Sequence, residues 1–196
     1  SGASAACTGS DGVYTCSGKI EKRQILPDQG VNADRPLKVT ISEEGTTVDT
    51  SGTTGHDAFT LDSKAEITFE DKTTGATITG ANNGIQAINS VSGGISITTT
   101  GTTTGETQDG IFAYNSHGTS LTINAATTTG GRHGIYAKNE STGALSITTT
   151  GTTTGTTNDG IFAYNSYYEG TDLTINAATT TGGRHGIYAR NEGTGA

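Results

Sequence analysis

The feature that most constrains this chain is an internal repeat. Residues 110–116 return unchanged at 160–166, and residues 134–137 return at 186–189. A shorter repeat lies between them, and each copy begins with a glycine or, once, with Ala58. The copies begin at positions 58, 84, 110, 134, 160 and 186, so they are spaced by 26, 26, 24, 26 and 26 residues. A period in the twenties predicts a solenoid, in which each coil of chain stacks on the previous coil.

Each coil is predicted to consist of short β-strands. After the first residue of each repeat, apolar residues alternate with other residues, which is the two-residue period of a strand. No segment shows a helical period. Leu121 and Ile123 mark a second strand in the coil. Threonine runs favour extended backbone because threonine is β-branched. We therefore predict an all-β fold, a right-handed parallel β-helix, with its hand taken from the general rule for parallel crossovers.

The alternation also predicts which side chains face the core. In one phase of the alternation, the residue that directly follows the first residue of the repeat is apolar; these residues are Phe59, Ile85, Ile111, Ile135, Ile161 and Ile187. The other phase includes Lys138 and Arg190, which would be costly to bury in a narrow core, so it is predicted to face outward. We interpret a polar column in the inward phase as an asparagine ladder at a turn, in which each amide donates to and accepts from its neighbours. Its members are Asn89, Asn115, Asn139, Asn165 and Asn191.

The N-terminus is predicted to be a cap held by a disulfide. Residues 1–29 break the period and contain the only cysteines, Cys7 and Cys16. No histidine lies near them for a zinc site, so we predict a disulfide and, with it, an exported protein; the alternative is two free thiols in a cytosolic protein. Residues 30–196 are predicted to form the β-helix, in coils of about 24–28 residues. Because residues 194–196 match residues 142–144, where a further strand follows, we expect the solenoid to be truncated at its C-terminus.

Charge and hydropathy narrow the classes of partner. The formal net charge of −8 disfavours nucleic acid and anionic membranes. No stretch approaches the roughly 20 apolar residues of a membrane helix, so we expect no membrane insertion by this fragment.

Residues 7–18 resemble the opening of many autotransporter (type V secretion) passenger domains, which are exported parts of Gram-negative surface proteins and are typically right-handed β-helices. The resemblance covers this cap and the repeat style of the whole chain. The chain departs from other passengers in having no protease domain and no Arg-Gly-Asp tripeptide. Its repeats resemble passengers of the Bartonella type, one family of which is proangiogenic and acts on the endothelial growth-factor receptor. The resemblance implies a virulence factor that is secreted or held at the bacterial cell surface.

An outward stripe of aromatic and cationic residues is the strongest functional signal. Successive coils lie about 4.8 Å apart, so these rings are expected to stack and the cations to lie over rings. The stripe has two rows, one of Phe112, Tyr136, Phe162 and Tyr188 and one of Tyr114, Lys138, Tyr164 and Arg190. It is a candidate binding face for a host receptor protein or a glycan, and the alternative is that the rings only stabilise the sheet.

Two other patterns carry weaker functional predictions. A column alternates acid or amide with imidazole, namely Asp57, Asn83, Asp109, His133, Asp159 and His185. We interpret it as an electrostatic ladder on the surface, because histidines two coils apart cannot share a metal and no third group converges for catalysis. The threonine runs resemble the ranks of ice-binding β-solenoids, but their blocks fall in alternate coils with glycines between them, which argues against a flat array in strict register.

Together these patterns predict a protein that is not an enzyme and has no cofactor and no metal. The function we predict is an autotransporter passenger that binds a host cell-surface receptor, as an adhesin or as a proangiogenic, receptor-activating factor. A passive structural stalk is the first alternative. A polysaccharide-acting β-helix enzyme is the second, and no cluster of carboxylates and cations supports it.

Overall fold

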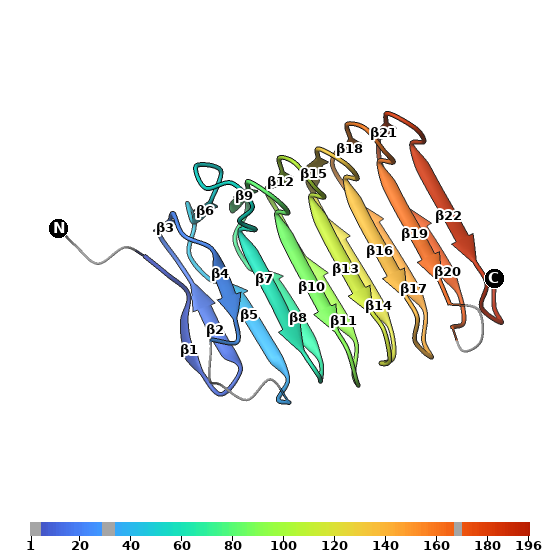
Figure 1. Ribbon diagram of the computed structural model, residues 1–196, viewed down its shortest axis with the longest axis horizontal. Coiled ribbons are helices and arrows are strands. Elements are labelled where there is room, and N and C mark those ends of the chain that lie inside the picture. The colour runs from blue at the N-terminus through green and yellow to red at the C-terminus, as the bar shows by residue number, and fades with distance from the viewer. Residues whose placement is uncertain (1–4, 29–33, 167–169) are drawn as a thin grey trace.

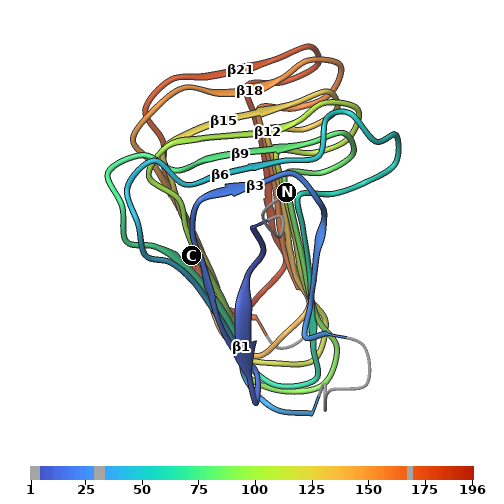
Figure 2. The same cartoon turned by 90° about the vertical axis from the view of Figure 1, so that its left-hand side faces the viewer.

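The chain folds as a parallel β-solenoid of about seven turns, which confirms the predicted all-β fold. The computed structural model describes residues 5–28, 34–166 and 170–196, and this part of the chain contains strands and no helix. The strands form three sheets that run side by side along one axis (Figure 1). Seen from the N-terminal end, every turn passes through the three sheets in the same order (Figure 2). Within the described residues, no helix is long and apolar enough to cross a membrane.

Each sheet collects one strand from every turn, and sheet 1 also contains β1, which pairs with β2. Sheet 1 contains β1 (Thr8–Ser10), β2 (Val13–Cys16), β5 (Leu37–Ile41), β8 (Ile67–Asp71), β11 (Ile95–Thr98), β14 (Leu121–Ala125), β17 (Leu145–Thr149) and β20 (Leu173–Asn176). Sheet 2 contains β3 (Lys19–Ile20), β6 (Thr47–Asp49), β9 (Thr77–Gly80), β12 (Thr102–Gly105), β15 (Thr127–Gly130), β18 (Thr153–Gly155) and β21 (Thr180–Gly182). Sheet 3 contains β4 (Gln24–Leu26), β7 (Phe59–Ser63), β10 (Ile85–Asn89), β13 (Ile111–Asn115), β16 (Ile135–Asn139), β19 (Ile161–Asn165) and β22 (Ile187–Asn191).

The period of the sequence sets the register of the strands. In sheet 3, Phe59 lies opposite Ile85, and each later isoleucine of the inward phase lies opposite the next. The first residue of a repeat is a glycine at all positions but Ala58 because adjacent coils approach closely at this residue. A Cβ added to Gly110 would lie 2.5 Å from Cγ2 of Thr128 and 2.7 Å from the carbonyl oxygen of Gly134.

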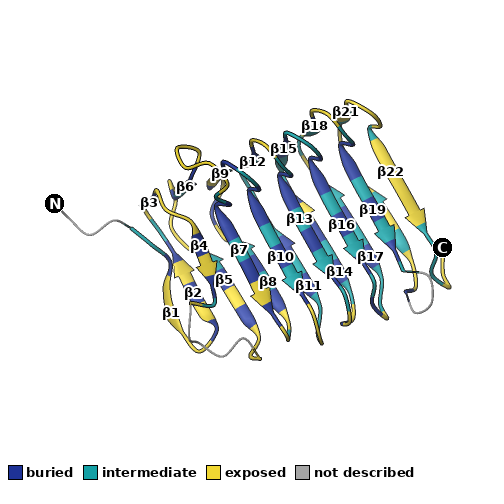
Figure 3. Cartoon of the chain, viewed as in Figure 1, coloured by how far each residue is buried: buried dark blue, intermediate teal, exposed yellow. Residues whose placement is uncertain are grey.

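The apolar core lies inside the three sheets and follows the predicted inward phase. The isoleucines of that phase are fully buried from Ile85 to Ile161, while the alternate residues of the same strands are partly exposed (Figure 3). In the last strand, β22, Ile187 is 41% exposed because no further strand pairs with it.

The predicted disulfide between Cys7 and Cys16 is present. It joins the segment before β1 to the end of β2, and β1 pairs antiparallel with β2. Strands β2, β3 and β4 then pair in parallel with β5, β6 and β7. The predicted cap segment, residues 1–29, therefore contains the first rung of all three sheets as well as the disulfide; its residues 1–4 and 29 lie outside the described part.

The asparagine column forms a hydrogen-bonded ladder at the end of the sheet 3 strands. The amide of Asn115 donates to Asn139 over 3.1 Å, Asn139 donates to Asn165 over 3.0 Å, and Asn165 donates to Asn191 over 3.1 Å. Asn89 departs from this pattern, because its amide donates to two backbone carbonyls.

The threonine blocks are in register on successive turns, contrary to the expectation that they fall in alternate coils. Thr79, Thr104, Thr129, Thr154 and Thr181 lie opposite one another on five consecutive strands of sheet 2. The expectation was wrong because blocks with different neighbours in the sequence reach the same position of the turn.

Candidate recognition surface

The outer face of sheet 3 carries four stacked aromatic rings. Phe112, Tyr136, Phe162 and Tyr188 lie opposite one another on β13, β16, β19 and β22. Their ring centroids are 4.9, 4.8 and 5.3 Å apart, and adjacent ring planes differ by 4–5°. Since each ring covers the face of the next, the stack presents mainly ring edges to solvent. The stack is a rigid, partly exposed apolar strip about four strands wide.

A second row lies beside the stack and alternates tyrosine with a cation. Lys138 Nζ lies 5.6 Å from the ring centroids of both Tyr114 and Tyr164, which is within cation–π distance. Arg190 occupies the next position of the row, opposite Tyr164. The two rows together, on β13, β16, β19 and β22, are called the aromatic band below; its members are Phe112, Tyr114, Tyr136, Lys138, Phe162, Tyr164, Tyr188 and Arg190.

Two glutamates that the sequence analysis missed hold the second row in place. Glu140 accepts a hydrogen bond from the hydroxyl of Tyr114 (2.5 Å) and pairs with Lys138 Nζ (2.8 Å). Glu192 accepts from Tyr164 (2.5 Å) and pairs with Arg190. Both glutamates directly follow a ladder asparagine and recur 52 residues apart, so the repeat itself contained the signal.

These contacts shift the pKa values of the ionisable side chains in and beside the second row. Burial and the hydrogen bond to Glu140 raise the pKa of Tyr114 to about 12. The hydrogen bond with Glu140 raises the pKa of Lys138. Burial opposes ionisation of Glu140, but the hydrogen bonds from Lys138 and Tyr114 hold its pKa below the usual value. At neutral pH the row therefore contains internally compensated charges, and its tyrosines keep their hydroxyl protons.

The acid–imidazole column is buried from Asp57 to Asp159, so the prediction of a surface ladder was wrong there; His185, on the last turn, is exposed. Asp109 and Asp159 have no exposed side-chain area, and His133 is 6% exposed. The physical reason is the strand period. Asp109 stands two residues before Ile111 and therefore shares its inward direction. The column lines the corner between sheets 2 and 3.

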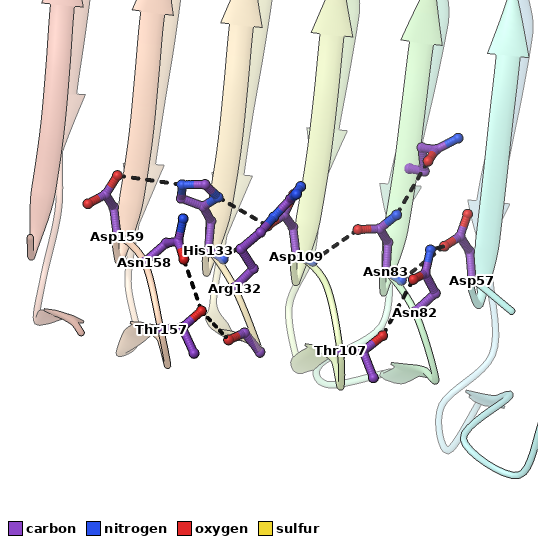
Figure 4. A network of polar contacts seen from close by, with 12 residues as sticks. Asp57, Asn82, Asn83, Thr107, Asp109, Arg132, His133, Thr157, Asn158 and Asp159 are labelled. Carbon is purple, nitrogen blue, oxygen red and sulfur yellow. Dashed lines mark hydrogen bonds and ion pairs between the residues drawn. The ribbon is translucent and has the colours of Figure 1, made fainter. Parts of the chain in front are cut away.

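Buried carboxylates in this corner are paired with cations from the next turn (Figure 4). Arg132 donates to both carboxylate oxygens of Asp109 over 3.2 and 2.9 Å. The backbone N–H of His133 donates to Asp109 over 2.9 Å, and Nδ1 of its ring lies 3.2 Å from the same oxygen. Nε2 of His133 lies 3.5 Å from Asp159 Oδ2, so the ring bridges two carboxylates.

The arrangement is repeated two turns later. Arg184 donates to both oxygens of Asp159 over 3.2 and 2.8 Å, and Nδ1 of His185 lies 2.9 Å from Oδ1. The hydrogen bonds from Arg184 and His185 lower the pKa of Asp159. Burial alone would raise the pKa of Asp109, but the hydrogen bonds from His133 and Arg132 outweigh it and lower that pKa. Both carboxylates are therefore held ionised inside the fold.

This corner supports the aromatic band from behind. The ring of His133 lies 5.5 Å from the ring centroids of Tyr136 and Phe162, and the ring of His185 lies 5.8 Å from that of Tyr188. The stack is thus fixed on one side by the buried ion network.

The described residues contain no group of three or more His, Cys, Asp or Glu side chains that could hold a metal ion. Both ring nitrogens of His133 face carboxylates that also accept hydrogen bonds from arginine, and the buried Nε2 forms no hydrogen bond. Both cysteines are in the disulfide, and the sequence contains no methionine.

Comparison with known protein families matches residues 18–195 to the family described as periplasmic copper-binding protein (NosD). This match spans nearly the whole chain. The chain belongs to the NosD family. No curated protein and no solved structure matches it.

Membership of the NosD family agrees with the β-helix architecture and with a location outside the cytoplasm, because the family is periplasmic. The disulfide fits the same location, since disulfides persist in oxidising compartments. The resemblance to autotransporter passengers is thus supported at the level of an extracytoplasmic β-helix protein.

Proposed function

We propose that this chain is a non-enzymatic recognition domain, exported as an autotransporter passenger, that binds a host cell-surface receptor protein through the aromatic band. The observation that carries the proposal is the stack of four partly exposed rings flanked by a row of tyrosines and cations. Aromatic residues and arginine dominate the binding energy of protein interfaces, which favours this face over the polar faces of sheets 1 and 2.

The geometry favours a protein over a glycan as the partner. Sugars bind aromatic side chains through ring faces, and in this stack the inner faces are covered by neighbouring rings. Ring edges, Lys138 and Arg190 remain for contact. The band is also rigid before binding, because both rows are held by strand register and by Glu140 and Glu192, so little side-chain entropy is lost on association. An endothelial growth-factor receptor is the first receptor to test, on the resemblance to proangiogenic passengers.

The residues of this chain do not fit the copper site that the family description suggests. Copper sites in proteins are built from converging His, Cys or Met ligands. The closest candidates, His133 and His185, are two turns apart, and each faces a buried carboxylate that arginine also binds. We therefore derive no copper-dependent activity for this chain.

A passive stalk is the alternative function, and one observation favours it. The charges of the second row are compensated within the row, as a purely structural brace would require. The two functions differ in what a band substitution should change, namely affinity for the receptor or stability of the fold.

The test measures both quantities on the same variants. Tyr188→Ser removes the most exposed ring of the stack, which is 37% exposed, and Tyr164→Ser removes a ring from the second row. Loss of a central aromatic anchor costs about 2 kcal/mol or more, which is about thirtyfold in affinity. We expect that loss in binding of the chain to host cells, with a small change in melting temperature, because the buried residues Ile161 and Ala163 are untouched.

Asn124→Ser, on the outer face of sheet 1, is the matched control and should leave both quantities unchanged. Lower melting temperatures with unchanged cell binding would contradict the recognition function and support the stalk.

A further inference from the structure

The outer face of sheet 2 carries two rows of threonine that the proposed function does not use. The residues of one row lie opposite one another along the solenoid, from Asp49 through Thr79 to Thr181. The other row lies two residues earlier on each turn, and its members Thr152 and Thr179 directly precede β18 and β21. The ten residues, called the threonine face below, are Thr77, Thr79, Thr102, Thr104, Thr127, Thr129, Thr152, Thr154, Thr179 and Thr181.

The hydroxyls of this face are available to a ligand. Within the described residues, none of the ten hydroxyls forms a hydrogen bond with another group of the protein. Threonines in the loops behave differently, since Thr107, Thr142 and Thr157 all donate to backbone carbonyls of the preceding turn. The strands of the face, β9, β12, β15, β18 and β21, contain no charged residue.

A groove lies at the N-terminal end of the threonine face. Its volume is about 530 Å³, and it is lined by Thr47, Thr77 and Thr79 of sheet 2. Residues 51–53, in the loop that projects beside β6 (Figure 2), also line it. Asp49 and Lys19 complete it; Asp49 Oδ1 accepts the N–H of Ser51, and Lys19 pairs with Glu21 at the rim.

We propose that sheet 2 binds a neutral, unbranched polysaccharide that lies along the solenoid axis with one end in this groove. A hydroxyl both donates and accepts, so rows of threonine can pair with the hydroxyls of successive sugars. Threonine is stiff at χ1, which orders the rows before binding. The turns repeat about every 4.8 Å, a length similar to one sugar unit of an extended chain. The absence of charge along the face selects against uronic and sulfated polymers.

The groove favours a polymer chain over a flat ice surface as the ligand. A regular threonine face alone would also suit ice, but the groove lined by residues 51–53 interrupts the flat surface at its N-terminal end. A polymer chain can enter the groove and continue along the rows. Asp49 and Lys19 then supply the polar contacts that distinguish one chain end or sugar from another.

The test is retardation of the whole chain in native gels that contain one soluble polysaccharide each, with neutral glucans, mannans and xylans as probes and heparin as the charged comparison. The site variant is the triple change Thr79→Val, Thr104→Val and Thr129→Val, which keeps shape and removes three hydroxyls. The matched control is Thr122→Val, Thr148→Val and Thr174→Val on the outer face of sheet 1. Asp49→Asn tests the groove separately.

We expect at least one neutral polysaccharide to retard the wild-type chain, the site variant to lose tenfold or more in affinity, and the control to stay within twofold. Circular dichroism checks that both triple variants keep the fold. No retardation by any neutral polymer, equal loss in both triple variants, or shaping of ice crystals without polysaccharide binding would each overturn the proposal. Because this face and the aromatic band lie on different sheets, receptor binding should be unaffected by the site variant.

Discussion

Replacing Asn139 by leucine tests the ladder that ends the sheet 3 strands. Asn139 is fully buried; its amide donates to Asn165 (3.0 Å) and to the carbonyl of Gly143 (3.2 Å), and it accepts from Asn115 (3.1 Å). Leucine removes all three hydrogen bonds. Asn115 retains one acceptor, the carbonyl of Ser120, whereas the side-chain oxygen of Asn165 loses its ladder donor. A buried polar group left without a partner costs about 1–3 kcal/mol, so we expect a loss of about 3 kcal/mol in the free energy of unfolding.

The assay is equilibrium denaturation in urea, followed by circular dichroism and by tyrosine fluorescence. Coincident transitions are required, because solenoids can unfold in steps. Asn124→Leu makes the same chemical change on the outer face of sheet 1, where Asn124 is exposed, and should change stability by less than about 0.5 kcal/mol. Equal effects of the two substitutions would refute the assignment of the ladder as a buried, hydrogen-bonded column.

Two further predictions concern ionisation. The pKa values of Asp109 and Asp159 are lowered in the fold, so their stabilisation is complete above the unfolded value near 3.9 and is lost as pH falls through the lower folded values. The melting temperature of the wild-type chain should therefore stay constant from pH 7 to pH 5 and decrease below about pH 4. In Asp109→Asn the melting temperature should decrease less steeply below about pH 4. A decrease of the wild-type melting temperature between pH 6 and pH 5 would contradict this. Glu140→Gln should lower the pKa of Tyr114 from about 12. The titration of Tyr114 is obtained as the difference in tyrosinate absorbance between chains that contain Tyr114 and chains that carry Tyr114→Phe. An unchanged pKa of Tyr114 in Glu140→Gln would contradict the role of Glu140.

Much of the fold could be predicted because one period controls both register and burial. The positions of Ile85, Ile111 and Ile135 along the sequence fix which residues lie opposite one another, and strand alternation then assigns inside and outside. The same reasoning placed the asparagine ladder and the aromatic stack, since both are columns of one residue type at one phase. Repetition converts a local pattern into a long-range contact.

The details at the turns could not be predicted in the same way. Asp109 was expected in a surface ladder, and the Arg132 that compensates its buried charge comes from the next turn, 23 residues later. Glu140 was missed because it follows the strand rather than alternating within it. The threonines of β12 and β15 reach one register from dissimilar sequence contexts, so their alignment depends on how long each turn is.

The most direct measurement of the central claim is site-specific photo-crosslinking on intact host cells. A photoreactive phenylalanine replaces Tyr188 in the aromatic band or, as control, Thr174 on the outer face of sheet 1. We expect a crosslinked adduct with one cell-surface receptor protein from position 188 and none from position 174, and competition by unlabelled wild-type chain but not by Tyr164→Ser. An adduct from position 174 alone, or none from either position while the chain still binds cells, would contradict recognition through the aromatic band.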